Sequence, residues 1–294
     1  LRQERGPMSQ VYTPSYLHEC FSILNEYPEA RLMAGGTDLL VRLRHAGAAV
    51  KPPLILLNNI PGLADIRLDT GDLCIGSGAS FSAIMAHPLV QNHAQLLAKA
   101  VGTIGGPAIR NMGTLGGNII TASPAGDSLP PLYAMDARLV LDSSAGTRII
   151  PIARFIGGPG KTDIQKDEIL TQIRIPLGDD VFQAQCFEKV GLRRSLAIAV
   201  TSFCGRLMFA KDGTVVRARF TWGSVAPTVA GSPEAETAVT GSRLDPETIK
   251  ISVTAATASL SPIDDIRASA HYRRTVAGNL LRRFLENAGA TNNT

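Results

Sequence analysis

The sequence has few cysteines, and their positions exclude a metal cluster held by this chain alone. Four cysteines occur in 294 residues, and none of them forms a C-x-x-C pair: Cys20, Cys74, Cys186 and Cys204. Iron–sulfur clusters need four thiolates in close sets, and the five histidines also lack metal-ligand spacing. We therefore expect buried free thiols, which are typical of a reducing compartment and predict a cytoplasmic location.

The chain also lacks long apolar runs and clustered charge. No apolar run reaches the roughly 18 residues needed to cross a bilayer, and residues 1–7 lack the apolar centre of a signal peptide. The net charge is only +4 and the basic residues are dispersed, so no nucleic-acid partner is expected. The G-x-S-x-G motif of many hydrolases is absent. Gly160-Lys161-Thr162 lacks the first glycine of a P-loop, since Phe155 stands there.

Periodicity and turn signals divide the chain into three parts and predict an α+β fold. Residues 1–60 alternate helix, strand, helix and strand, which predicts a small and mostly parallel lobe. Residues 61–178 mix hairpin signals with helical patterns, which predicts a larger mixed lobe. Residues 179–294 follow a boundary at Gly178-Asp179-Asp180 and predict a small antiparallel sheet followed by helices. The last helix is expected over Ala268 to Glu286, with a frayed tail from Ala288.

A glycine pair near the N-terminus lies between an apolar strand and a helical pattern. The run is Leu32-Met33-Ala34-Gly35-Gly36-Thr37-Asp38-Leu39. A strand, a glycine turn and a helix start favour anions, because free N–H groups and the helix dipole point at the turn.

A second and longer glycine-rich run extends from Arg110 to Leu132. It contains four glycines, four hydroxyl residues, two Asn and one Asp. Glycine permits positive φ and the close approach of a ligand, and successive N–H groups can form a nest for phosphate oxygens. Gly-Asn and Ser-Pro are also ordinary turn formers, so one such run leaves both interpretations open. Two of them indicate a two-phosphate ligand between two lobes, which a dinucleotide satisfies.

Both runs resemble the FAD-binding medium subunit of molybdenum hydroxylases, a family that includes xanthine, nicotinate and carbon monoxide dehydrogenases. The matching motifs are Ala34-Gly35-Gly36-Thr37-Asp38-Leu39 and Thr114-Leu115-Gly116-Gly117-Asn118-Ile119, with Ala122-Ser123-Pro124 and Asp127. The resemblance continues through Gly158-Pro159-Gly160-Lys161, Asp167-Glu168-Ile169-Leu170, the Lys189 to Ala199 segment and Tyr272-Arg273-Arg274. It implies a two-lobed FAD-binding domain of the PCMH type, followed by a small antiparallel sheet with a helical bundle.

The resemblance implies one cofactor site and neither a catalytic residue nor a metal ligand on this chain. The implied cofactor-binding residues are Leu32, Met33, Ala34, Gly35, Gly36, Thr37, Asp38, Leu39, Ile104, Gly105, Thr114, Leu115, Gly116, Gly117, Asn118, Thr121, Asp127, Leu170 and Lys189. The first loop would contact the pyrophosphate, and the second would close it from the other lobe. Asp127 would accept from ribose or ribityl hydroxyls, because a carboxylate repels phosphate. Lys189 would donate to a flavin or phosphate oxygen.

The implied function is electron transfer within a larger complex. Electrons would pass from [2Fe-2S] clusters of a small subunit through noncovalent FAD to an acceptor, and a large subunit would carry molybdopterin. A heterotrimer or a dimer of heterotrimers is expected. The alternatives are a stand-alone FAD-dependent oxidase or reductase of similar fold and a nucleotide-binding assembly chaperone. Several relatives carry an acidic residue where Ala197 stands here, so NAD, quinone, oxygen and protein acceptors all stay open.

Overall fold

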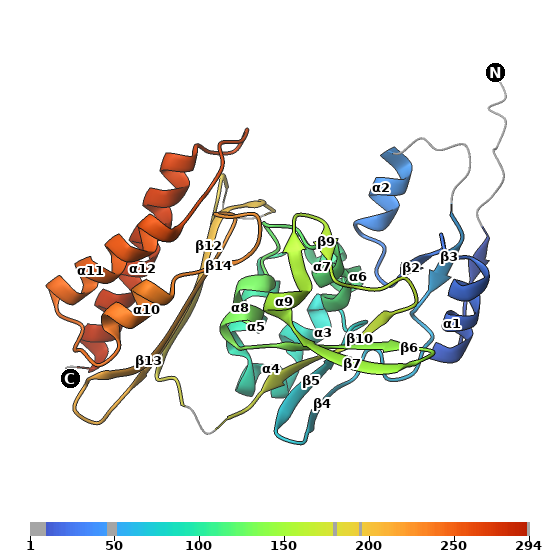
Figure 1. Ribbon diagram of the computed structural model, residues 1–294, viewed down its shortest axis with the longest axis horizontal. Helices are drawn as coiled ribbons and strands as arrows, with labels where there is room; N and C mark the ends of the chain where they lie inside the picture. Colours follow the sequence, from blue (N-terminus) through green and yellow to red (C-terminus); the bar gives the residue numbers. More distant parts are fainter. Residues whose placement is uncertain (1–9, 46–51, 179–180, 194–195, 293–294) are drawn as a thin grey trace.

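The structure, a computed structural model, describes residues 10–45, 52–178, 181–193 and 196–292, with side chains through residue 290 (Figure 1). Most of the predicted boundary at Gly178-Asp179-Asp180 lies outside these residues, as do residues 1–7 and the end of the predicted tail. The described chain forms one three-stranded, one five-stranded and one four-stranded sheet, with a short hairpin beside them.

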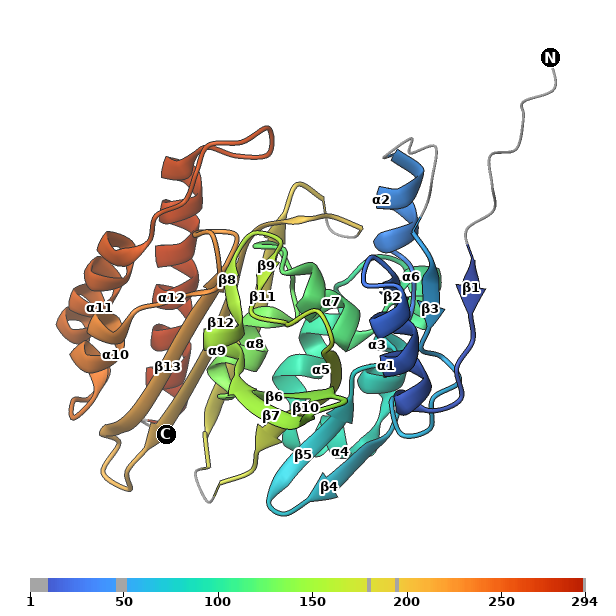
Figure 2. The ribbon, with the colours of Figure 1, turned by 45° about the vertical axis from the view of Figure 1, so that its right-hand side comes forward.

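The N-terminal lobe is small and built on a parallel sheet of order β1-β3-β2. Its elements are β1 (Val11–Tyr12), α1 (Leu17–Glu26), β2 (Arg31–Met33), α2 (Leu39–His45) and β3 (Leu54–Leu56). Helix α1 packs on the sheet through Cys20 and Leu24, which are both buried. The predicted parallel sheet is therefore confirmed. Helix α2 projects from the lobe beside α6 and α7 (Figures 1 and 2).

The middle of the chain folds around an antiparallel sheet of order β4-β5-β10-β6-β7. Its strands are β4 (Ile66–Asp69), β5 (Asp72–Gly76), β6 (Arg138–Ser143), β7 (Gly146–Pro151) and β10 (Ile169–Pro176). The helices are α3 (Phe81–Ala86), α4 (Pro88–His93), α5 (Gln95–Gly102), α6 (Pro107–Met112), α7 (Leu115–Thr121), α8 (Leu129–Ala134) and α9 (Ile152–Phe155), and the short hairpin is β8 (Ile156–Gly158) with β9 (Lys161–Thr162). Both predicted hairpins, β4-β5 and β6-β7, are confirmed.

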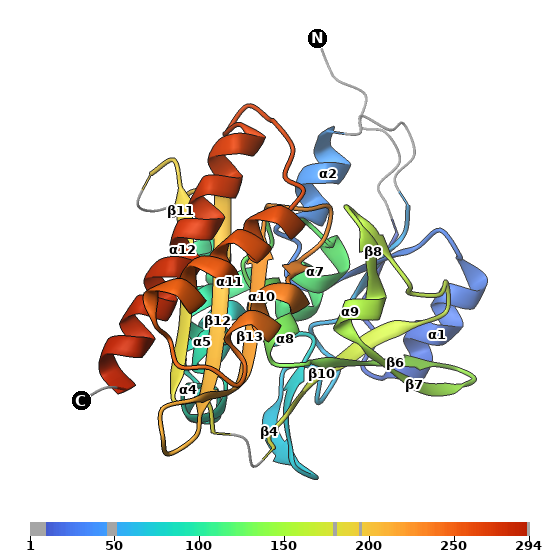
Figure 3. The ribbon, with the colours of Figure 1, turned by 60° about the vertical axis from the view of Figure 1, so that its left-hand side comes forward.

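The C-terminal part is an antiparallel sheet of order β11-β12-β13-β14. Its elements are β11 (Ala184–Gly191), β12 (Ala199–Phe209), β13 (Val215–Gly223), β14 (Ala230–Gly231), α10 (Pro233–Val239), α11 (Pro246–Ser259) and α12 (Ala270–Asn292). Helices α10 to α12 cover one face of this sheet, and α5 and α8 lie against the other (Figure 3). The predicted frayed tail is wrong for residues 288–292, because α12 continues through them.

The C-terminal sheet is attached directly to the segment that follows α7. The Thr221 hydroxyl donates to the Pro130 carbonyl at 2.9 Å, and the Ser224 N–H donates to the Pro124 carbonyl at 2.9 Å. The predicted fold class is confirmed: a parallel lobe, a mixed lobe and an antiparallel sheet with helices on its outer face. Among the described residues, no helix is long and apolar enough to cross a membrane.

Candidate functional site

The first glycine loop, residues 34–38, connects β2 to α2. Gly36 has φ +69°, which lies in the left-handed region that glycine adopts without strain. A Cβ on Gly35 would lie 1.8 Å from the Met112 carbonyl oxygen, so only glycine permits this approach to the end of α6. The two glycines predicted from sequence thus have separate tasks. One turns the chain, and the other lets the small lobe touch the larger one.

Several polar groups of this loop have no partner within the described chain. No described residue accepts a hydrogen bond from the main-chain N–H of Gly35, Gly36, Thr37 or Asp38, and none bonds the Thr37 hydroxyl. The Asp38 carboxylate pairs with Arg42 at 2.7 Å and accepts a bond from the Thr121 hydroxyl at 3.3 Å. The loop therefore offers a row of donors next to a carboxylate that is already neutralised.

The second glycine run contains the start of helix α7, which already uses several of its own N–H groups. Thr114 is the N-cap of α7, and its hydroxyl accepts from the Gly117 N–H at 3.2 Å. The Leu115 and Gly116 N–H groups donate to carbonyls of residues 79 and 77 at 3.1 and 2.8 Å. Neither Gly116 nor Gly117 has a positive φ. The physical reason for glycine at position 116 is close packing, because a Cβ there would lie 2.6 Å from Ser77 Cβ.

A buried ion pair lies where the C-terminal sheet meets the middle lobe. Lys189 of β11 donates to Asp127 Oδ2 at 2.6 Å and to the Thr103 carbonyl at 3.0 Å. The other carboxylate oxygen of Asp127, Oδ1, is buried and has no hydrogen-bond partner among the described residues. Burial raises the pKa of Asp127 to about 6, although Lys189 opposes the change. The resemblance implied a separate ligand contact for each of these two residues. In the structure, each is also the other's charge partner.

Two further contacts hold the segments around this pair. Asn118 Oδ1 accepts from the Ser128 hydroxyl at 2.6 Å, so α7 is tied to the turn that carries Asp127. The Arg110 guanidinium donates to the Ile104 and Gly105 carbonyls at 3.1 and 2.8 Å. Arg110 therefore fixes the loop between α5 and α6, in which Gly105 has φ +49°.

The structure brings most of the predicted residues together, but not all by their side chains. Leu32 and Met33 lie in β2, Leu39 opens α2, and Thr121 ends α7 beside Asp38. Leu115 and Leu170 are 0% and 4% exposed as whole residues and belong to the core of the middle lobe. The structure therefore places these two predicted residues behind the surface of the site and not in it.

Sequence reasoning missed three residues that hold this site. Thr103 accepts from Lys189, Arg110 holds the loop at Gly105, and Ser128 bonds Asn118. Arg110 carries a signal in the sequence, because it is the only cation in the second glycine run. Thr103 acts through its carbonyl and Ser128 through one hydroxyl in a polar turn, so neither is distinguished by residue type.

Leu196, one of the described residues between β11 and β12, lies over the same region. Leu196 has φ +54°, and Arg193 donates to its carbonyl at 2.6 Å. A Cβ on Gly106 would lie 3.3 Å from the Leu196 side chain, so Leu196 reaches the loop that precedes α6. Ala197, which follows Leu196, is therefore next to the candidate site.

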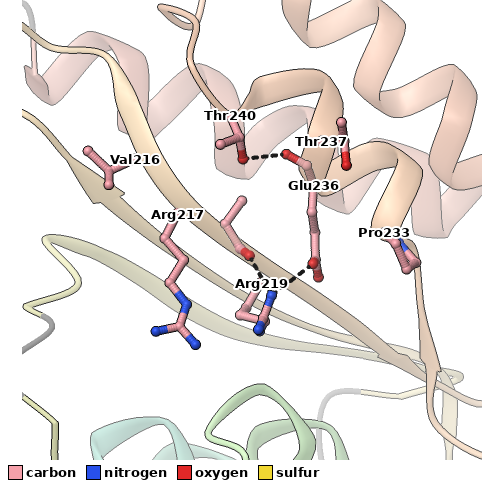
Figure 4. Close-up of a pocket in the computed structure, with 8 residues that line it drawn as sticks. Val216, Arg217, Arg219, Pro233, Glu236, Thr237 and Thr240 are labelled. Carbon is pink, nitrogen blue, oxygen red and sulfur yellow. Dashed lines mark hydrogen bonds and ion pairs between the residues drawn. The ribbon is translucent and has the colours of Figure 1, made fainter.

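A cavity of about 340 Å³ opens elsewhere, between β13 and α10 (Figure 4). Arg219 pairs with Glu236 at 3.2 Å, and the other Glu236 oxygen accepts from the Phe220 N–H at 2.8 Å. Burial raises the pKa of Glu236. Both carboxylate oxygens of Glu236 have partners that attach α10 to the sheet, so the charges that line this cavity have a structural role. None of the predicted site residues lines the cavity.

The four cysteines are free thiols in the structure. Cys20, Cys74 and Cys204 are buried and Cys186 is half-buried. No group of three or more His, Cys, Asp or Glu side chains that could hold a metal ion occurs among the described residues.

Known families match nearly the whole chain. Residues 7–178 match the family described as FAD binding domain in molybdopterin dehydrogenase, and residues 186–288 match the CO dehydrogenase flavoprotein C-terminal domain. The putative xanthine dehydrogenase FAD-binding subunit of Escherichia coli K12 is 30% identical over 93% of this chain and 94% of its own length. The carbon monoxide dehydrogenase medium chain of Hydrogenophaga pseudoflava is 29% identical over 97% and 98%.

Solved structures give the same result. Carbon monoxide dehydrogenase from Hydrogenophaga pseudoflava has a chain that superimposes with a TM-score of 0.89 at 29% identity, covering 98% of this chain and 99% of that one. Quinoline 2-oxidoreductase from Pseudomonas putida 86 has one with a TM-score of 0.89 at 27% identity, covering 98% and 99%. The chain belongs to the family of FAD-binding medium subunits of the molybdenum hydroxylases, which are oxidoreductase complexes of several subunits.

Proposed function

We propose that this chain holds FAD noncovalently between its two glycine motifs, with the Asp127–Lys189 pair at one end of the site. The observation that carries the proposal is the buried Asp127 Oδ1, which has no partner in the part of the chain that the structure describes. An unsatisfied buried acceptor is costly, so a ligand hydroxyl or N–H in that place would remove the cost. The predicted residues keep their assignment: Leu32 to Leu39, Ile104, Gly105, Thr114 to Asn118, Thr121, Asp127, Leu170 and Lys189.

The first loop supports the phosphate end of the site. The N–H groups of residues 35–38 and the Thr37 hydroxyl, which bond no described residue, can donate to pyrophosphate oxygens. The first turn of α7 contributes differently, because Thr114 and two loop carbonyls already accept its N–H groups. We assign it the role of a wall that closes the site through the close packing of Gly116. No His or Cys adjoins either glycine motif, which supports noncovalent binding.

FAD, when bound, supplies one-electron and two-electron transfer, and the residues of this chain bind and orient it. The iron–sulfur clusters and molybdopterin belong to a small and a large partner subunit, because the described chain offers no cluster of ligands for a metal. The relatives named medium chains support this division. We propose a heterotrimer or a dimer of heterotrimers in the cytoplasm, with domains at residues 1–60, 61–178 and 179–294.

The site is tested by Asp127→Asn, which keeps the shape of the side chain but removes the buried charge that faces Lys189. A lost hydrogen bond to a charged group costs about 1.5–3 kcal/mol, so the Kd for FAD should rise about 10- to 100-fold. Released FAD per chain after acid precipitation and flavin fluorescence titration measure the effect. Asp136→Asn is the matched control, because Asp136 is an exposed residue that pairs with Arg217. Equal FAD affinity in both variants would remove Asp127 from the site.

The electron-transfer role is tested with partner subunits. The purified chain should show no flavin reduction when N-heterocycles or aldehydes are added anaerobically. Addition of the iron–sulfur and molybdopterin subunits should restore rapid reduction. Bleaching of the flavin by substrate in the chain alone would contradict the proposal and favour a stand-alone flavoenzyme.

A further inference from the structure

Ser128 stands at the N-cap position of helix α8 without capping it. A serine at this position usually accepts a hydrogen bond from a main-chain N–H in the first turn of the helix. Here the backbone of Ser128 lies in the right-handed helical region, and its side chain makes no capping bond. Its hydroxyl is buried and donates instead to Asn118 Oδ1 of α7 at 2.6 Å. A buried hydroxyl needs a partner, and this one has its partner on another helix.

This bond leaves one end of the Asn118 side chain unused. A carboxamide has an acceptor oxygen and an NH2 group with two donors. The oxygen accepts from Ser128, whereas no described residue accepts from Nδ2. Asn118 is half-buried, and Nδ2 is not one of the fully buried atoms of the described chain that lack a partner. The NH2 group is therefore accessible to a ligand.

Asn118 lies on the face of α7 that turns toward the first glycine loop. Asn118 and Thr121 are three residues apart and share a helix face, and the Thr121 hydroxyl donates to Asp38 at 3.3 Å. Helix α7 lies between α8 and the small lobe (Figures 1 and 2). Asn118 therefore stands between two parts of the candidate site: the loop at residues 34–38 and the turn that carries Asp127.

The side chain of Asn118 can supply what the main chain of the second glycine motif cannot. The N–H groups of residues 115–117 already have acceptors, and the Asn118 N–H donates to the Thr114 carbonyl at 3.1 Å. An amide whose oxygen is occupied presents donors only. Donors form strong hydrogen bonds with the ionised oxygens of a phosphate, whereas an outward-facing amide oxygen would repel them.

We propose that Ser128 is a positioning residue of the cofactor site: its hydroxyl holds the Asn118 amide so that Nδ2 donates to a phosphate oxygen of FAD. This inference rests on the proposed function. Ser128 is 0% exposed, so it acts through Asn118 by fixing which end of the amide the ligand meets. Without the hydroxyl, the amide can rotate and present its oxygen.

A double-mutant cycle on the full chain tests the proposal, with flavin fluorescence titration for the Kd of FAD and urea unfolding for stability. Asn118→Ala should raise the Kd about 10- to 100-fold, as expected for a lost hydrogen bond to a charged group. Ser128→Ala should raise it about fivefold. In the double variant, Ser128→Ala should change the Kd of Asn118→Ala by less than about twofold, because two residues of one hydrogen-bonded unit are not independent.

Two further variants separate positioning from packing. Ser252→Ala is the matched control, because Ser252 of α11 is also 0% exposed and its hydroxyl donates to the Ala235 carbonyl at 2.9 Å. It should lose a comparable amount of stability and leave the Kd for FAD unchanged. Asn118→Asp keeps an acceptor for Ser128 but places a charged oxygen where Nδ2 stands. It should raise the Kd about 100-fold or more, because a carboxylate repels phosphate.

Three results would overturn the inference. The effects of Ser128→Ala and Asn118→Ala on the Kd could multiply in the double variant, which would make the two residues independent. Ser252→Ala could lose as much affinity as Ser128→Ala, which would make the effect one of packing. Asn118→Asp could bind FAD nearly as well as the wild type, which would mean that Oδ1 faces the ligand.

Failure of the proposed function gives a different result. A wild-type chain that binds no FAD contradicts the proposed function and this inference with it. A wild-type chain that binds FAD, together with independent effects in the cycle, contradicts only the role of Ser128.

Discussion

The two glycine motifs look alike in sequence but differ in what their main chain has left to offer. In the first loop, no described residue accepts from the N–H groups of residues 35–38. In the second, the N–H groups of Leu115, Gly116 and Gly117 already have acceptors at 3.1, 2.8 and 3.2 Å. A glycine pair therefore does not by itself make an anion site. The decisive property is whether the chain satisfies its own donors.

The glycines of the two motifs also serve different contacts. Gly35 lets the small lobe approach the Met112 carbonyl, while Gly116 lets α7 approach Ser77 within the middle lobe. The first contact spans the two lobes between which we place the cofactor, and the second is internal to one of them. We infer that the first loop is the part of the site whose disturbance affects the ligand most.

Among the variants considered, Gly35→Ala is expected to have the largest effect on FAD content. The added Cβ would lie 1.8 Å from a backbone oxygen that cannot rotate away, so the lobes must separate. Overpacking of this kind costs about 1–3 kcal/mol or more, and FAD content should fall below detection. Gly117→Ala is the comparison, because its Cβ would lie 3.0 Å from the movable Thr114 hydroxyl. Its unfolding free energy should stay within about 1 kcal/mol of the wild type. Equal loss of FAD in both would make the two motifs equivalent.

The next largest expected effect is a pH dependence of the unfolding free energy, which the Asp127–Lys189 pair produces. Burial raises the pKa of Asp127 from 3.8 to about 6. Between these values the folded chain keeps a proton that the unfolded chain has released, so stability falls as pH rises across this window. The free energy of unfolding decreases by about 3 kcal/mol, and this decrease is complete above pH 6. Urea unfolding of the FAD-free chain, compared with Asp127→Asn from pH 4 to 8, isolates this contribution.

A Lys189→Met variant tests whether the ion pair sets this pH dependence of stability. Removing the ammonium leaves the buried carboxylate without its charge partner, so its pKa should rise further and the loss of stability should continue above pH 6. The double variant with Asp127→Asn should lack this slope. A Lys189→Met chain with the wild-type pH profile would show that the ion pair does not form in solution.

Much of the fold follows from patterns that the sequence displays. The alternation in residues 1–60 predicted the parallel sheet, and the patterns of residues 179–294 predicted the antiparallel sheet that β11 to β14 form. Helix α7 was not predicted, because two glycines in its first turn lower helix propensity. Thr114 as an N-cap was the available signal. Tertiary packing against Ser77 outweighs the propensity.

The arrangement of the site was less accessible to sequence reasoning. The resemblance named Asp127 and Lys189, but not that they bond each other, since 62 residues separate them. That contact depends on how the C-terminal sheet meets the middle lobe, which no local pattern encodes. The unsatisfied oxygen of Asp127 is likewise a property of the packed structure. Residue types can nominate members of a site, whereas their mutual pairing comes from topology.

The smallest expected changes in stability and FAD affinity come from replacing one threonine in each motif. These two variants compare the motifs most directly. The Thr37 hydroxyl has no described partner, so Thr37→Val should change the unfolding free energy by less than about 0.5 kcal/mol. If this hydroxyl donates to a phosphate, the Kd for FAD should rise about tenfold. Thr114 caps α7 through the Gly117 N–H at 3.2 Å. Thr114→Val should therefore cost about 1 kcal/mol of stability and raise the Kd less than about threefold.

Chemical denaturation and flavin titration on the two proteins separate these outcomes. A crossed result is expected, with stability lost in one variant and affinity in the other, because one hydroxyl is used by the fold and the other is left for a ligand. The reverse pattern, in which Thr114→Val loses FAD and Thr37→Val does not, would move the phosphate to the start of α7. That position requires the Gly117 N–H to exchange its cap for the ligand, and the other two N–H groups of the turn would stay bonded to the loop at residues 77–79.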